Sequence, residues 1–289
     1  MIPESTTSPT VLRYAAFADA PDGGNPAGIV LDANDLRDAE MQRIAADVGY
    51  AETAFVTEGA IAGDPRHLRI RYFSPIAEVP FCGHATIATA VVLAERDGAG
   101  TLEFETPIGP VVIETSAGGD GITASFTSVE PDVAPVPSDV EDELLHLLGL
   151  TRDDLDARYP LLSSYAGNWH PILVLRERAA FDAFTFDPRA VRTLMDAQGW
   201  RGTVSVLFAI APTVFEARNL FPVGAITEDP ATGSAAASLG GYLRATGSVA
   251  VPAHVEIRQG AHVGRASVLD VTIPATGGIV VSGTATPIA

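Results

Sequence analysis

The sequence predicts an α/β (α+β) protein of two pseudo-symmetric domains, each a β half-barrel wrapped around one central helix. Residues 71–93 and 218–243 follow the same order: a loop, then a glycine with a polar neighbour, then an Ala-rich helix. The matching glycines, Gly83 and Gly233, lie 150 residues apart. A chain of 289 residues is also long enough for about two domains.

Apolar periodicity predicts the elements of the first half. Apolar residues at 41, 44, 45 and 48 have helical spacing, so residues 38–48 should form a helix. Residues 67–73 alternate as a half-buried strand does, and Gly24-Asn25-Pro26 predicts a turn. Further strands are expected at 11–18, 27–31, 54–57, 101–106 and 111–115, and the Ala-rich helix at 84–97.

The second half repeats this order after a Pro-containing stretch at residues 125–137 that reads as a loop. We expect domains at 1–127 and 128–289, with the last strands able to pack back on the first domain. Ser138 is a good N-cap for an acidic helix at 138–149. Further strands are expected at 172–175, 204–210, 213–218, 255–259, 266–273 and 279–284, and the second Ala-rich helix at 233–245.

The two Ala-rich helices have no polar face, so each should lie inside its domain. Their Gly, Ala and Ser side chains are small. Strands can therefore approach these helices closely on all sides, which is why we expect a sheet curved around each one.

Composition limits the partners. The net charge is −18 with only 18 basic residues, which argues against nucleic acid and anionic membranes as partners. No apolar run approaches the 18 residues of a membrane span. The first residues lack the features of a secretory signal. Cys82 is the only cysteine, so no intrachain disulfide can form. Both observations lead us to expect a cytoplasmic protein. No metal-ligand spacing is present, because the histidines stand apart.

The two helix starts predict an anion site. The first amide groups of a helix lack intrahelical partners and the helix dipole is positive there, so Gly83, Gly233 and Ser234 are suited to a small anionic substrate. Ser234 is equally well explained as a helix cap. A phosphate role ranks last, because neither start carries the lysine of a P-loop.

Four further residues each have a structural and a chemical interpretation. Glu52 is either solvated on a loop or held in a cleft with a raised pKa, suited to acid/base catalysis. His84 is either a buried capping residue or a donor to substrate. Asp229 either complements the helix dipole or binds a substrate amine or hydroxyl. Cys82 is either a core residue or a reactive thiol at a helix start.

Five motifs, in this order along the chain, resemble those of the PhzF family of phenazine-biosynthesis-like isomerases: Gly24-Asn25-Pro26-Ala27-Gly28, Glu52-Thr53-Ala54-Phe55, Arg71-Tyr72-Phe73-Ser74-Pro75, Cys82-Gly83-His84-Ala85-Thr86 and Asp229-Pro230-Ala231-Thr232-Gly233-Ser234-Ala235. The resemblance implies a diaminopimelate-epimerase-like fold, an active site in the cleft between the domains, no cofactor and a homodimer. It also implies that Glu52 shuttles the proton, with His84 and Asp229 as further catalytic residues and Gly233 and Ser234 in substrate binding.

The resemblance also has a departure. Related epimerases use two cysteines, but Thr232 stands opposite Cys82 in the second copy. A two-thiol inversion is therefore disfavoured, and a glutamate-based proton shift on a small carboxylate-bearing substrate is the expected function. Asn25 and Tyr72 are expected to line the site. An epimerase or racemase on the same fold and a non-catalytic binding protein remain alternatives, and a phenazine role is not implied.

Overall fold

A computed structural model describes residues 9–119, 121–223 and 226–289. Residues 1–8, on which the absence of a secretory signal was inferred, lie outside the described residues. The chain divides into two compact units. Unit 1 comprises the chain up to Ala16, Pro26–Ala124 and Thr284–Ala289; unit 2 comprises Phe17–Asn25 and Ser125–Gly283. Whether each folds independently as a domain, with a boundary at 127/128, stays a prediction.

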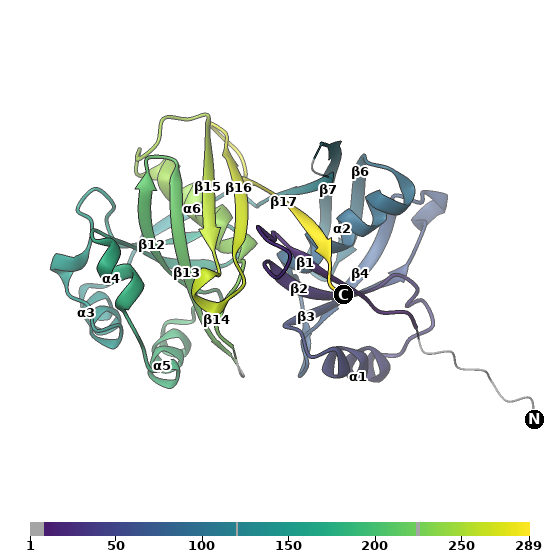
Figure 1. The fold of residues 1–289 in the computed structure, drawn as a ribbon, viewed down its shortest axis with the longest axis horizontal. Coiled ribbons are helices and arrows are strands. Elements are labelled where there is room, and N and C mark those ends of the chain that lie inside the picture. Colours follow the sequence, from purple (N-terminus) through teal and green to yellow (C-terminus); the bar gives the residue numbers. More distant parts are fainter. Residues whose placement is uncertain (1–8, 120, 224–225) are drawn as a thin grey trace, which may run out of the picture. The chain divides into compact units, whose positions relative to one another are not determined.

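Unit 1 holds one helix against the outside of its sheet and one inside it (Figure 1). Helix α1 packs Met41, Ile44 and Ala45 on the sheet, whereas α2 is buried along most of its length. The elements are β1 (Leu12–Ala16), β2 (Asn25–Val30), α1 (Asp38–Val48), β3 (Glu52–Glu58), β4 (His67–Phe73), β5 (Glu78–Val79), α2 (Gly83–Asp97), β6 (Thr101–Thr106), β7 (Gly109–Gly118) and β8 (Gly121–Thr127), the last continuing into unit 2.

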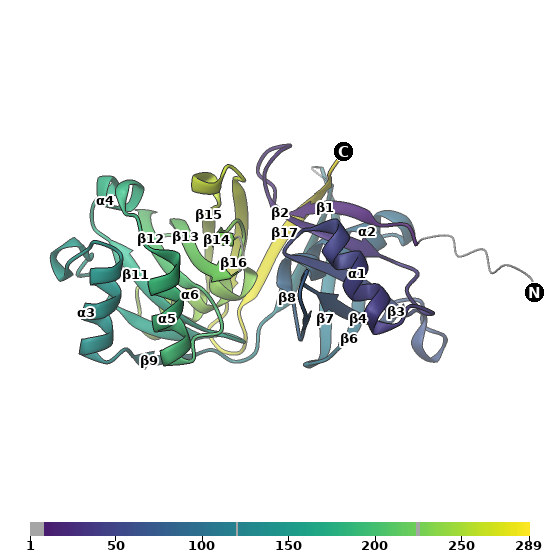
Figure 2. The same cartoon turned by 90° about the horizontal axis from the view of Figure 1, so that it is seen from below.

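Unit 2 has the same plan, with three outer helices and one inner helix (Figure 2). Its elements are β9 (Asp132–Pro135), α3 (Ser138–Leu147), β10 (Leu162–Tyr165), β11 (Trp169–Leu175), α4 (Arg178–Ala183), α5 (Pro188–Gln198), β12 (Val204–Ala211), β13 (Val214–Val223), β14 (Ile226–Asp229), α6 (Gly233–Ala245), β15 (Ala253–Gln259), β16 (Ser267–Ile273) and β17 (Val280–Pro287). Strand β17 ends in unit 1, where Ala15 pairs with Thr286.

Strand pairing shows the internal repeat. In unit 1, β2 and β3 are parallel, β3–β4 and β4–β5 are antiparallel, β4 and β6 are parallel, and β6–β7 are antiparallel. In unit 2, β11 to β16 repeat these pairings in the same order. Helices α2 and α6 occupy matching places, after β5 and β14. The prediction of two similar halves around central helices is therefore confirmed.

Small residues allow the strands to approach α6. A Cβ atom at Gly240 would lie 2.7 Å from Ile279 Cγ2, and one at Gly241 would lie 2.4 Å from Pro131 Cβ. Contacts below about 3 Å are not tolerated in close-packed interiors. The glycines of this helix are thus a packing requirement.

Three local predictions are wrong. The stretch at 125–137 is not a loop, because it contains the end of β8 and all of β9, whose residues pair with β10. Asn25 and Pro26 do not form a turn but begin β2. Ser138 is the first residue of α3 and not its N-cap, which is Pro137.

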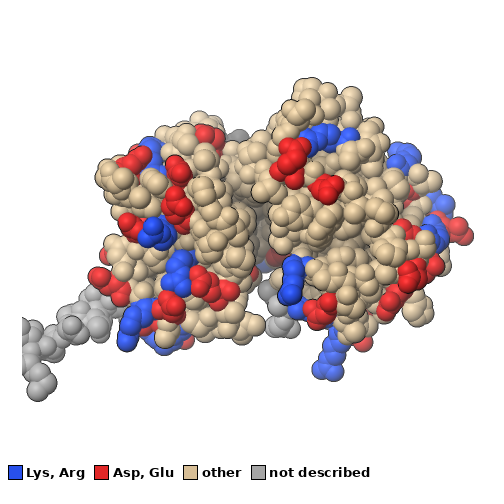
Figure 3. Space-filling view, turned by 180° about the vertical axis from the view of Figure 1, so that it is seen from behind, with Lys and Arg blue, Asp and Glu red and all other residues tan. Residues whose placement is uncertain are grey.

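Basic and acidic groups are mixed on the face of the molecule in Figure 3. All 18 basic residues are arginines, and on the face in Figure 3 they lie scattered among acidic side chains. Within the described part of the chain, no helix is long and apolar enough to cross a membrane.

Candidate active site

Glu52 lies at the beginning of strand β3 and not in a loop. It pairs with Ala27 of the parallel strand β2, so its backbone is fixed by the sheet. Its side chain is 18% exposed. The carboxylate is therefore held on a rigid element while keeping some contact with solvent.

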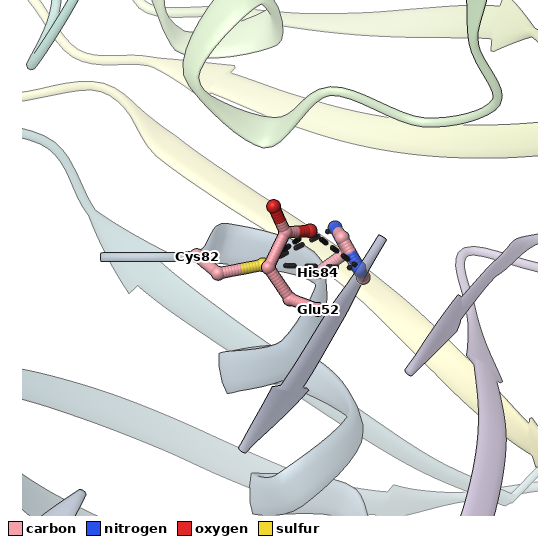
Figure 4. Close-up of side chains that lie close together, drawn as sticks. All are labelled: Glu52, Cys82 and His84. Atoms are coloured by element: carbon pink, nitrogen blue, oxygen red, sulfur yellow. Dashed lines mark hydrogen bonds and ion pairs between the residues drawn. The ribbon is translucent and has the colours of Figure 1, made fainter. Parts of the chain in front are cut away.

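Cys82 and His84 approach this carboxylate from the start of helix α2 (Figure 4). The Cys82 thiol donates to Glu52 Oε2 over 3.5 Å and lies 3.3 Å from His84 Nδ1. His84 Nε2 lies 3.5 Å from Glu52 Oε2. Cys82 is the N-cap residue but its side chain makes no capping hydrogen bond, so the thiol faces the cluster.

His84 is neutral at pH 7. Burial lowers the pKa of its imidazole to about 4, although a hydrogen bond with the Pro26 backbone acts in the opposite direction. An ion pair with Glu52 requires a protonated imidazole, so at neutral pH the two groups can interact only by hydrogen bonding. The Glu52 carboxylate is therefore not neutralised by a histidine cation.

The sequence shows no metal-ligand spacing, yet folding brings two groups of possible ligand side chains together; the expectation of no metal site stays a prediction. Glu52, Cys82 and His84 bring one ligand atom each within 4.8 Å of one another, as do His67, Glu103 and Glu105 at the surface. Spacing along the chain did not reveal these groups, because strand pairing brings distant residues together. Both groups are chemically able to ligate a divalent ion.

Asp229, at the end of β14 in unit 2, is fixed by two donors. Asn25 Nδ2 donates to Asp229 Oδ1 over 2.8 Å, and Thr232 Oγ1 donates to Asp229 Oδ2 over 2.5 Å. Burial raises the pKa of the Asp229 carboxyl to about 6, while these two hydrogen bonds lower it. Asn25 also donates to the Ala231 carbonyl, so it orients the turn that leads into α6.

Ser234 lies in the first turn of α6, next to Gly233. Its hydroxyl is 3.1 Å from Nε2 of His170, a buried residue of β11 that sequence reasoning did not select. A lone histidine in an otherwise apolar strand was the available signal. A Cβ atom at Gly233 would meet Phe126 Cζ at 3.1 Å, so the helix start packs tightly at this glycine.

Tyr72 lies in the core of unit 1. It is 0% exposed, and its hydroxyl is 2.6 Å from Thr86 Oγ1, which in turn donates to the Cys82 carbonyl. Burial raises its pKa above the usual value. Tyr72 therefore supports the start of α2 from inside, and its expected place in the lining of the substrate site stays a prediction.

Comparison with known proteins identifies the family. The PhzC-PhzF family, phenazine biosynthesis-like protein, matches residues 14–289. A trans-2,3-dihydro-3-hydroxyanthranilate isomerase from Pseudomonas chlororaphis is 34% identical over 255 residues, covering 88% of this chain and 86% of the relative. A crystal structure of a PhzF-family phenazine biosynthesis protein from Bacillus anthracis has a TM-score of 0.83 at 27% identity, covering 96% of each chain.

A more distant structure confirms the epimerase-like fold. A probable proline racemase from Agrobacterium radiobacter K84 has a TM-score of 0.64 at 11% identity, covering 96% of this chain and 91% of that one. The likeness in this case concerns the fold alone. By sequence and by structure, the chain belongs to the PhzC-PhzF family of phenazine biosynthesis-like proteins and is an isomerase.

Proposed function

We propose that this isomerase is cofactor-independent and moves a proton on a small carboxylate-bearing substrate, with Glu52 as the acid/base group. The observation that carries the proposal is the Glu52 carboxylate, fixed at the start of β3 against Cys82 and His84. A carboxylate on a rigid element can remove a proton from an activated carbon and return it elsewhere on the same conjugated system.

His84 and Asp229 assist in this proposal. His84 is neutral at pH 7, so its imidazole can donate or accept a hydrogen bond without adding charge. With a pKa of about 6, Asp229 exchanges its proton close to neutral pH and can orient a substrate amine or hydroxyl. Asn25 keeps the Asp229 carboxyl in place.

The substrate carboxylate is assigned to the starts of α2 and α6. Helix N-termini attract anions through their amide groups and the helix dipole. The expectation that both helix starts hold one substrate stays a prediction, as does the homodimer. The named activity of the Pseudomonas chlororaphis relative makes trans-2,3-dihydro-3-hydroxyanthranilate the first trial substrate.

The test is Glu52→Gln, assayed by substrate conversion and by deuterium incorporation from D₂O. Gln keeps the shape of the side chain but removes the base, so kcat should fall about 10²–10⁴-fold. The matched control is Glu58→Gln at the other end of β3, where the side chain pairs with Arg69 and is 45% exposed; its activity should be unchanged.

Other outcomes discriminate between functions. Full activity of the Glu52→Gln protein would rule out Glu52 as the base. Deuterium exchange with inversion at one stereocentre would instead identify an epimerase or racemase. Ligand binding without any proton exchange, across a panel of small carboxylates, would identify a binding protein.

A further inference from the structure

His170 is a buried titratable residue that the proposed function does not use. It lies in β11 and is 0% exposed. Burial lowers the pKa of its imidazole to about 4, so the ring is neutral at pH 7. The ring packs against Gly202, where a Cβ atom would lie 2.5 Å from His170 Cε1. Its position is therefore fixed by the backbone beside it.

The two ring nitrogens have different partners. Nδ1 faces Thr203, whose backbone N–H donates to it over 3.0 Å, while Nε2 faces the Ser234 hydroxyl at 3.1 Å. A neutral imidazole carries one N–H. The position of that hydrogen decides whether Ser234 accepts or donates the hydrogen bond to the ring.

A network of buried amides fixes the direction of the neighbouring bonds. The backbone carbonyl of Asp229 can only accept, so Gln259 Nε2 faces it, and Gln259 Oε1 accepts from Asn219 Nδ2. Asn219 Oδ1 therefore faces the other way, where it accepts from the hydroxyls of Thr203 and Ser205. The Thr203 hydroxyl can donate to Asn219 Oδ1, and it also lies 3.0 Å from His170 Nδ1.

Nδ1 is the acceptor for the Thr203 N–H. If Nδ1 carried the hydrogen, it could donate to the Thr203 carbonyl or to the Thr203 hydroxyl, each 3.0 Å away, but the buried Thr203 N–H would then have no acceptor among the described residues. Orphaned buried N–H groups are rarer and costlier than under-satisfied carbonyls. The hydrogen therefore belongs on Nε2, which leaves the Thr203 N–H with an acceptor at Nδ1 and the Nε2–H with an acceptor at Ser234.

We propose that His170 is a positioning residue: its Nε2–H donates to Ser234 Oγ and so makes the Ser234 hydroxyl a fixed hydrogen-bond donor for a substrate carboxylate at the start of α6. The assignment of a carboxylate to Ser234 rests on the proposed function. A hydroxyl that already accepts from His170 turns its own hydrogen outward, which suits an anionic oxygen and not an ammonium group.

The first test is direct and needs no ligand. In the full-length protein with ¹⁵N-labelled histidine, long-range ¹H–¹⁵N NMR at pH 7 distinguishes the two neutral tautomers, and the His170→Asn protein identifies the His170 signals. We expect the proton on Nε2. A proton on Nδ1 would overturn the inference, because Ser234 would then donate into the ring.

The second test measures ligand preference. The probes are anthranilate and 2-aminobenzamide, which have similar shape but differ in the carboxylate, with binding followed by calorimetry. His170→Asn keeps an acceptor near the position of Nδ1 but has no atom at Nε2. The preference for anthranilate should fall about tenfold, as expected for a hydrogen bond to a charged group. His170→Gln, whose amide reaches toward Ser234, should restore part of that preference.

The Ser234→Ala background separates positioning from structural damage. There, His170→Asn should change the preference less than about twofold, because the group it orients is gone. The inference would be overturned if His170→Asn weakened the binding of both probes equally. It would also be overturned if His170→Asn reduced the preference for anthranilate as much in the Ser234→Ala protein as in the wild type. Failure of the wild-type protein to prefer anthranilate would overturn the carboxylate assignment, whereas the proposed base is judged separately by Glu52→Gln.

Discussion

The buried Asp229 carboxyl should destabilise the protein at neutral pH, and Asp229→Asn should remove that cost. The pKa of this carboxyl is about 6 in the folded protein, against 3.8 for the ordinary group, chiefly because of burial. The folded state therefore binds the proton more tightly than the unfolded state does. The stabilisation that results is fully present below pH 3.8 and is lost as the pH rises through 6.

The magnitude follows from the two pKa values. At pH 7 the ionised carboxyl costs about 3 kcal/mol of folding free energy, and at pH 5 about 1.5 kcal/mol. Asn can still accept from Asn25 but disturbs the bond from Thr232, a loss of about 1 kcal/mol that does not depend on pH. The gain from Asp229→Asn should therefore be larger at pH 7 than at pH 5 by about 1.5 kcal/mol.

The assay is urea unfolding followed by tryptophan fluorescence at pH 5 and pH 7. Both tryptophans, Trp169 and Trp200, lie in unit 2 together with Asp229, so the signal reports the relevant unit. The control is Asp182→Asn, an exposed carboxyl whose pKa is lowered by Arg178 and which should show no such gain. An Asp229→Asn protein whose stability change is the same at both pH values would refute the reasoning.

Two further substitutions test the packing and the hydrogen bonding inside the two units. Gly241→Ala should destabilise the protein by about 1–3 kcal/mol, measured by the same fluorescence, because its Cβ would meet Pro131 at 2.4 Å. The control is Gly59→Ala, which meets no atom within 4 Å, and stability equal to that control would refute the packing argument. Tyr72→Phe should lose about 1 kcal/mol in thermal unfolding followed by circular dichroism, because the hydroxyl bonded to Thr86 is removed. Its kcat should stay unchanged, and a large loss of kcat would show that Tyr72 acts on the substrate.

Periodicity located the elements best where one face is buried. The helix Asp38–Val48, the strand His67–Phe73 and the helix Gly233–Ala245 have the predicted bounds. Helix α5 was not predicted, although Asp187 caps it, Pro188 occupies its first turn and its apolar residues have helical spacing. Strand β9 carries proline and too few apolar residues to stand out, and its pairing with β10 defines it.

The sequence by itself determined the class of fold and the chemical groups available. The repeat at Gly83 and Gly233 was visible in the chain because each glycine begins a helix rich in small residues, and the matching strand pairings show that the two halves share one plan. Local spacing is sufficient for such inferences, because helices and strands bury their faces with fixed periods.

Only the tertiary structure decided which groups meet. Glu52, at the beginning of β3, contacts Cys82 and His84 at the start of α2. Ser234 contacts His170, which lies 64 residues earlier in the chain. These contacts depend on strand register and on burial, which also sets the pKa values of His84 and Asp229. Neither register nor desolvation has a signature in neighbouring residues, because both arise from segments that are distant in the sequence.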